Sequence, residues 1–242
     1  MSPTSATAVP LPSVQTVWKI VRKGNPAKAL VKDENAPVPT EVPEGCILLR
    51  IQAASLNPVY AYPQPCRLTP DFCAGLMLFV CGRGFKLMRM APNSFFKRAA
   101  EYDFAGEVVD VNGNPGFKIG DQVFGSIPVG ASFKNGQGAL AQYAYVPAKT
   151  TAHRPEGISP NEASGIAIVA MTAYAAVYQF GKLEAGQRVF INGGTTSVGI
   201  YVIQIAKALG CKVYASASGK NEQFLKDLGV DEVCICQPKP NV

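Results

Sequence analysis

The chain has 242 residues, of which 48% are apolar and 17% are charged. This balance is typical of a folded globular protein and excludes a disordered one, and the length allows one large domain or two smaller ones. The net charge of +6 comes from scattered basic residues such as Lys97-Arg98, which favours a mildly basic surface over nucleic-acid binding. The most apolar run, residues 74–81, is far shorter than the roughly 18 residues of a membrane span, and no secretory signal is recognisable.

The cysteines and the histidine bear on compartment and metal binding. Seven cysteines, an odd number without a secretory segment, favour reduced thiols and a cytoplasmic location. No CxxC pair is present and His153 is the single histidine, so no metal ligands are predicted. His153 precedes Arg154-Pro155 and is interpreted as structural.

The first half of the chain predicts a series of short strands. They are residues 16–21, 46–54, 104–111, 121–124 and 139–146. Turn-forming residues separate them, as in Ser55-Leu56-Asn57-Pro58 after the second strand. Several short strands with turns between them indicate a β-rich, barrel-like domain.

The pattern changes near Ser159. Ser159-Pro160-Asn161-Glu162 reads as an N-cap with proline first and glutamate third in the helix. Helices are expected over 163–169 and 172–180, and strands then alternate with helices, which is the sign of a parallel sheet. The predicted domains are therefore residues 1–155 and 156–242.

A strand, a glycine-rich turn and a helix follow one another in the second domain. The strand covers residues 188–191, the helix runs from about 198 to 209 before Gly210, and a second strand covers 212–215. Glycines allow a pyrophosphate to approach the backbone, and the free N–H groups of the helix start attract its charge. The candidate cofactor-binding residues here are Gly193, Gly194, Thr195, Thr196, Ser197, Val198 and Gly199. The alternative is a glycine-containing turn that binds no phosphate.

The end of the second strand bears on the choice of cofactor. NAD sites usually have a carboxylate there, whereas this chain has Ser218, Lys220 and Asn221. A lysine charge and a serine hydroxyl suit a 2′-phosphate, so NADPH is predicted. The alternative is an ordinary polar turn that caps the helix over 221–228.

Five further segments carry a family resemblance. They are Ala53-Ala54-Ser55-Leu56-Asn57-Pro58-Val59, Tyr102-Asp103-Phe104-Ala105-Gly106-Glu107-Val108, residues 116–125, Gly138-Ala139-Leu140-Ala141-Gln142-Tyr143 and Met171-Thr172-Ala173-Tyr174. In this order, and with the glycine turn, they resemble the zinc-free quinone-oxidoreductase and enoyl-reductase branch of the medium-chain dehydrogenase/reductase superfamily. Thr196 and Ser197 stand where the commoner family turn has glycines, and their hydroxyls can still donate to phosphate.

The resemblance implies a fold and a chemistry. It implies a GroES-like barrel domain followed by an incomplete Rossmann dinucleotide-binding domain, and hydride transfer from NADPH to an activated alkene or a quinone. Zinc is not expected, because the family's zinc-binding members carry a Gly-His-Glu that this chain lacks. Asn57 matches a position near the nicotinamide and the substrate carbonyl, where an amide would donate to an enolate oxygen, or else it forms an Asn-Pro turn. Thr172 matches a position that contacts the nicotinamide amide, or else it is a helix N-cap.

Two segments depart from the family pattern. Residues 60–83 form an atypical insertion, and the likeness ends near residue 234. Translated introns, a genuine family insertion and a deliberately shortened chain remain open explanations. The family is usually homodimeric, but the missing part of the sheet leaves that in doubt here. Two functions also remain open: an NADPH-dependent reductase, or a truncated or non-catalytic relative with little or no activity that acts as an interaction protein or is a mis-spliced gene product. Because part of the sheet is missing, the chain as given is expected to be a poor enzyme with a marginal fold.

Overall fold

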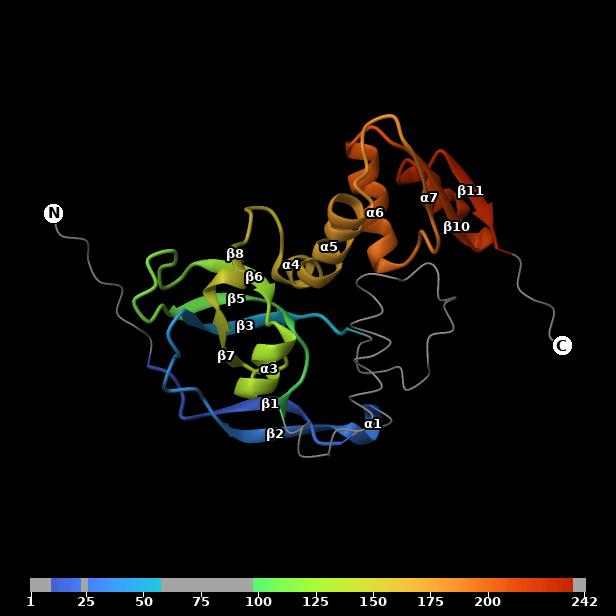
Figure 1. Cartoon of the computed structure of the whole chain (residues 1–242). Coiled ribbons are helices and arrows are strands. Elements are labelled where there is room, and N and C mark those ends of the chain that lie inside the picture. The colour runs from blue at the N-terminus through green and yellow to red at the C-terminus, as the bar shows by residue number, and fades with distance from the viewer. Residues whose placement is uncertain (1–9, 23–25, 58–97, 237–242) are drawn as a thin grey trace. The chain divides into compact units, whose positions relative to one another are not determined.

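The computed structural model describes residues 10–22, 26–57 and 98–236 (Figure 1). The chain divides into two compact units, residues 1–167 and 168–242. The predicted boundary at 155/156 lies before a short helix that packs on the sheet of the first unit. The atypical insertion at 60–83 lies outside the described residues, as do residues 237–242.

A five-stranded antiparallel sheet forms the main part of the first unit. Its strands are β3 (Cys46–Ala54), β5 (Asp103–Asp110), β6 (Gln122–Ser126), β7 (Tyr143–Pro147) and β8 (Thr151–His153). They pair in the order β7-β3-β5-β6-β8. Alternate residues of β6 and β7 are buried, as the period-two pattern requires. The core of this sheet contains Ile47, Leu49, Phe104, Val108, Val123 and Val146.

A second, smaller antiparallel sheet lies in the same unit. It consists of β1 (Val14–Ile20), β2 (Leu30–Pro37) and β4 (Arg98–Ala99), in the order β2-β1-β4. A bridge between Val17 and Ala141 and a hydrogen bond from the Trp18 N–H to the Leu140 carbonyl connect β1 to the chain before β7. The predicted β-rich first half is therefore confirmed.

The helices in the described part of the first unit are short. They are α1 (Pro26–Ala29), α3 (Val129–Asn135), the 3₁₀-helix η4 (Ala148–Thr150) and α4 (Pro160–Ser164). The predicted capping box opens α4: the Ser159 hydroxyl accepts from the Glu162 N–H at 3.3 Å, and the Glu162 carboxylate accepts from the Ser159 N–H at 2.8 Å. This helix packs on β3, β5 and β6.

The second unit is a parallel βαβ arrangement. It contains β9 (Arg188–Ile191), α6 (Ser197–Ala208), β10 (Lys212–Ala217), the 3₁₀-helix η6 (Gly219–Asn221), α7 (Glu222–Asp227) and β11 (Glu232–Ile235). Both strand pairs are parallel, in the order β11-β10-β9, so the predicted parallel sheet is confirmed. The core contains Ile191, Ile203, Ala206, Val213, Ala215 and Leu225.

The helices before β9 differ from the prediction. Instead of helices over 163–169 and 172–180, α4 ends at Ser164, and α5 (Ala167–Tyr174) continues directly into a π-helix, η5 (Ala175–Phe180). The N–H of Gly165 bonds back to α4 and ends it, whereas no glycine or proline interrupts residues 167–180. The break between the helices therefore falls earlier than expected.

The predicted strand over 139–146 is also shorter in the structure. Ala139 and Leu140 donate their N–H groups to the carbonyls of Glu101 and Ala100, and regular pairing with β3 begins only at Tyr143. Long-range partners at residues 100 and 101, which the local pattern does not reveal, set this boundary.

Candidate functional site

The glycine turn joins β9 to α6 and is held by the end of β10. Gly193 has a φ of 79°, a left-handed backbone that suits glycine. Its N–H donates to the Ser216 hydroxyl at 2.8 Å, and the Gly194 N–H donates to the Ser216 carbonyl at 2.9 Å. The Ser216 hydroxyl in turn donates to Asn192 Oδ1 at 2.8 Å. Ser216, which the sequence did not single out, therefore anchors the turn to β10.

Two glycines let α6 pack close to the turn and the sheet. A Cβ on Gly199 would lie 2.4 Å from the Gly193 carbonyl oxygen, and one on Gly194 would lie 2.8 Å from the Ala215 Cβ. Both distances are shorter than real contacts allow, so a larger residue at Gly199 would push the start of α6 from the turn, and one at Gly194 would push the turn from β10. The spacing Gly194-x-x-x-x-Gly199 thus fixes where the helix begins relative to the strand ends.

Thr196 is the N-cap of α6. Its Oγ1 accepts from the Gly199 N–H at 3.0 Å, and its hydroxyl donates to the Gly193 carbonyl at 2.9 Å. The one hydroxyl proton of Thr196 is therefore donated within the turn, so Thr196 does not offer the donor to phosphate that the sequence predicted. Ser197, which is exposed, begins the helix, and the N–H groups of Ser197 and Val198 belong to the first turn, where a helix provides no acceptor of its own.

The end of β10 presents three of the predicted residues. Ser218, exposed, precedes η6 and accepts from the Asn221 side-chain amide at 3.1 Å. Lys220 is exposed, and among the described residues no hydrogen bond or ion pair engages its ammonium group. Ser218 and Asn221 therefore form a polar turn, but neither side chain caps the following helix as the alternative interpretation expected. The exposed Lys220 charge remains available to an anion.

Thr172 lies within α5, so it is not the helix N-cap that the sequence allowed. Its hydroxyl donates to the Ile168 carbonyl at 2.7 Å, one turn earlier in the helix. The two lone pairs of the hydroxyl oxygen can still accept hydrogen bonds.

Asn57 lies after β3, in the first unit, and faces two carboxylates. Its N–H donates to Glu101 Oε2 at 2.9 Å, and its Nδ2 lies 3.2 Å from Asp103 Oδ2 and 3.4 Å from Glu101 Oε2. Ser55 adds a hydroxyl hydrogen bond to Asp103 Oδ2 at 3.2 Å. Glu101 and Asp103 are 5% and 1% exposed, and burial raises the pKa of Glu101, although the two donors of Asn57 oppose that rise.

The sequence predicted Asn57 but not the role of Glu101. Asp103 lay within a quoted family segment, and Glu101 stood just before it. A charged residue at the edge of a strand gives no local sign of burial, because its partner is 44 residues away.

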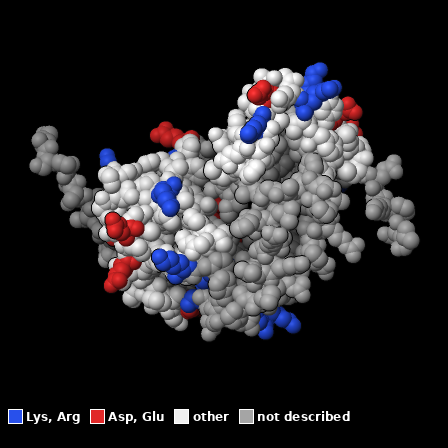
Figure 2. Space-filling view, in the orientation of Figure 1, with Lys and Arg blue, Asp and Glu red and all other residues white. Residues whose placement is uncertain are grey.

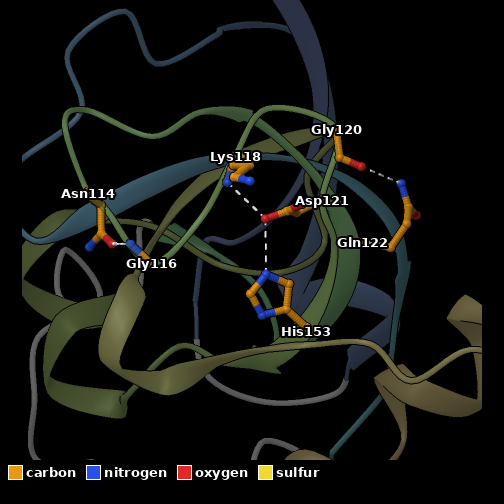
Figure 3. A network of polar contacts seen from close by, with 7 residues as sticks. All are labelled: Asn114, Gly116, Lys118, Gly120, Asp121, Gln122 and His153. Atoms are coloured by element: carbon orange, nitrogen blue, oxygen red, sulfur yellow. Dashed lines mark hydrogen bonds and ion pairs between the residues drawn. The ribbon is translucent and has the colours of Figure 1, made fainter. Parts of the chain in front are cut away.

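His153 takes part in a polar network at the loop before β6 (Figure 3). Its Nε2 lies 3.0 Å from Asp121 Oδ2, and its ring stacks on Phe117. Burial works against ionisation of Asp121, but the Lys118 N–H and His153 outweigh it and lower the pKa of Asp121. This arrangement braces a loop and agrees with the structural interpretation of His153.

The described residues also bear on metals, membranes and surface charge. No group of three or more potential ligands occurs among them, and none of their helices is long and apolar enough to cross a membrane. On the face shown in Figure 2, the basic and acidic side chains of the described part are interspersed.

The chain resembles several oxidoreductases, although no protein-family model matches it. It is 30% identical over 236 residues to the mitochondrial NAD(P)H oxidoreductase RTN4IP1 of Danio rerio, covering 91% of this chain and 55% of that protein. It is 32% identical over 231 residues to the 2-methylene-furan-3-one reductase of Solanum lycopersicum, covering 94% and 53%. The solved quinone oxidoreductase of Coxiella burnetii matches with a TM-score of 0.72 and 26% identity, over 91% of this chain and 62% of that one.

A GroES-like β-rich domain followed by a Rossmann-type βαβ unit defines a two-domain, dinucleotide-binding class of protein. Within that class, the chain belongs to the medium-chain dehydrogenase/reductase superfamily, beside its quinone oxidoreductases and enoyl reductases. It spans about half the length of the curated relatives given above.

Proposed function

We propose that this protein is an NADPH-dependent, zinc-independent reductase that delivers hydride to an activated alkene or a quinone. The observation that carries the proposal is the glycine turn between β9 and α6, where the Ser197 and Val198 N–H groups have no partner among the described residues and lie at the carboxyl edge of a parallel sheet. The named relatives support the chemistry: one uses NAD(P)H, one reduces an enone and one reduces a quinone.

The residues of the turn fit a dinucleotide. Gly193 and Gly194 have no side chains and so allow the tight turn. The N–H groups of Ser197 and Val198 would hold the pyrophosphate. The hydroxyls of Thr195 and Ser197 would add donors. Thr196 and Gly199 hold the conformation of the turn through the hydrogen bond between them and through that from Thr196 to Gly193. Bound NADPH would supply the hydride, and all other steps fall to the chain's own residues.

Lys220 is proposed to select NADPH over NADH. Its ammonium group is exposed beyond the end of β10, where NAD sites usually carry a carboxylate. Ser218 and Asn221 hold the turn that carries Lys220, and the Ser218 hydroxyl proton can still be donated to a 2′-phosphate.

Asn57 and Thr172 are proposed to act at the reacting end. By resemblance, the Asn57 amide donates to the oxygen on which charge develops after hydride transfer. The substrate oxygen would replace the longer of its two side-chain contacts, at 3.4 Å, and leave the one to Asp103 intact. The Thr172 oxygen would accept from the nicotinamide carboxamide while its proton stays on the Ile168 carbonyl.

We also propose that the protein works without zinc and in the cytoplasm. The four described cysteines are free thiols, which suits a reducing compartment. The Danio rerio relative, in contrast, is named as mitochondrial.

Binding of NADPH and NADH to the whole chain tests the proposal. We expect NADPH to quench or enhance its own fluorescence on binding and to raise the melting temperature, because a ligand at about 100 times its Kd stabilises the folded state by about 2.7 kcal/mol. Lys220→Ala should weaken the binding of NADPH by about 1–3 kcal/mol, as for loss of a charge-assisted hydrogen bond, and leave the binding of NADH unchanged.

Lys226→Ala is the matched control, because this exposed lysine of the same unit pairs with Glu222 in α7 and should leave both affinities unchanged. Equal losses for both cofactors in Lys220→Ala would remove the 2′-phosphate assignment. Absence of any NADPH effect on fluorescence and melting would show that the glycine turn binds no dinucleotide.

A further inference from the structure

Glu101 occupies a backbone conformation that its side chain makes unfavourable. Its φ is 62°, in the left-handed region that glycine adopts freely and a long side chain does not. Asn112 also has a positive φ, but asparagine tolerates that region, and its amide bonds to the Val42 carbonyl. A glycine would adopt this φ at a lower cost than glutamate, so the contacts of the Glu101 side chain are the place to look for a compensating role.

That side chain reaches across to the end of β3. Its Oε2 accepts the Asn57 backbone N–H at 2.9 Å and lies 3.4 Å from the Asn57 side-chain nitrogen. Asp103 Oδ2 lies 3.2 Å from the Asn57 side-chain nitrogen and accepts from the Ser55 hydroxyl at 3.2 Å. Glu101 therefore holds the Asn57 backbone through the shorter bond, and its longer contact with the side-chain nitrogen is the one that the substrate oxygen would replace.

The charged members of the cluster are buried and electrostatically coupled, whereas Asn57 itself is half-buried. Glu101 and Asp103 are almost fully buried, and so is Arg98, the nearby cation on β4. Burial and the Asp103 carboxylate raise the pKa of Glu101, while Asn57 and Arg98 lower it. Burying a carboxyl group is unfavourable unless hydrogen bonds and nearby positive charge offset the loss of hydration.

We propose that Glu101 is a positioning residue that fixes Asn57 in the orientation required for its proposed role in hydride transfer. The proposal rests on the proposed function of Asn57. The left-handed backbone of Glu101 is retained because it directs the carboxyl at residue 57, so strain at one residue orders another. Removal of the carboxyl should free Asn57 while relaxing the backbone.

Hydrogen exchange of the Asn57 amide in the full chain tests this, since it needs no turnover. In Glu101→Gly we expect the Asn57 backbone amide to exchange at least tenfold faster, while the melting temperature rises or stays constant. Glu101→Gln should retain most of the protection, because its side-chain carbonyl still accepts from Asn57.

Two controls separate positioning from general effects. Glu107→Gln changes a glutamate of the neighbouring strand that pairs with Arg50 and should leave Asn57 exchange unchanged. Lys182→Gly relieves another positive φ, of 45°, and should raise the melting temperature without affecting Asn57.

Unchanged Asn57 exchange in Glu101→Gly would overturn the proposal, as would a fall in melting temperature of several degrees with Asn57 protection intact. If Glu101→Gly does not fold, a tenfold loss of Asn57 protection in Glu101→Gln at full stability would also contradict it. In preparations that reduce an enone, Glu101→Gly should lower kcat at least tenfold with little change in the KM for NADPH. A wild-type chain without turnover would count against the proposed function, while the exchange result would still decide the role of Glu101.

Discussion

Thr196→Ala tests the cap at the start of the candidate cofactor site. The change removes two hydrogen bonds of one hydroxyl: the Gly199 N–H loses its acceptor and the Gly193 carbonyl loses its donor. An N-cap replaced by alanine costs about 1 kcal/mol, within a range of roughly 0.5–2 kcal/mol. The second bond adds little, because Thr196 is exposed and water can reach the Gly193 carbonyl.

The expected loss is therefore about 1–2 kcal/mol, or a fall in melting temperature of about 2–8 °C for a chain of this size. Thermal unfolding followed by circular dichroism measures it. Thr196→Ser keeps the hydroxyl and should unfold close to the wild type. Thr196→Gly should lie between serine and alanine, because glycine at an N-cap costs only a few tenths of a kcal/mol.

The expected order of stability, with serine above glycine and glycine above alanine, follows from helix capping by the hydroxyl group. If serine destabilises the chain as much as alanine does, the methyl group and not the hydroxyl stabilises the turn. If alanine has no effect, the two hydrogen bonds do not contribute to stability and the reasoning about the helix start is wrong.

Two further predictions concern pH. Asp231 accepts a hydrogen bond from the Val213 N–H at 2.6 Å and pairs with Lys207, and these contacts lower the pKa of Asp231. Its contribution to stability is therefore present above its ordinary pKa of 3.8 and is lost as the pH falls through the lowered pKa of the folded state. Asp231→Ala should reduce the unfolding free energy at pH 7 by about 1–3 kcal/mol and flatten the acid side of the stability curve, and an unaltered acid slope would contradict this. The raised pKa of Glu101 acts in the opposite sense: the folded chain holds that proton more tightly, so stability falls as the pH rises from 4.5 through the folded pKa. Glu101→Gln should abolish that decline in chemical denaturation series, and a slope equal to the wild type would show that Glu101 does not titrate there.

Local signals were sufficient for residues 188–215 of the second unit. A short apolar strand, glycines, a helix with one apolar face and a stopping glycine all occur within residues 188–215, so neighbours in sequence decide the structure. Gly210 ends α6 as expected: its N–H bonds to the Lys207 carbonyl, and the Cys211 N–H bonds to the Ala206 carbonyl. The capping box at Ser159 is of the same kind.

Elements that depend on partners far away in the sequence could not be predicted from local signals. Most residues of β2 are exposed or half-buried and show no alternation, and this strand forms because β1 pairs with it. The short helix α3 carries a glycine and follows a proline, which locally favour a turn. Whether α3 forms and is partly buried depends on tertiary packing.

The sequence by itself determined the βαβ unit, the glycine turn and the choice of Asn57, Ser218 and Lys220 as candidates. Only the tertiary structure decided what holds them: Ser216 under the turn, Thr196 bonded back to Gly193, and Glu101 against the Asn57 backbone. The physical reason is range. Backbone propensity and capping act over a few residues, whereas a buried carboxyl at residue 101 acquires its role only when folding brings it within hydrogen-bond distance of residue 57.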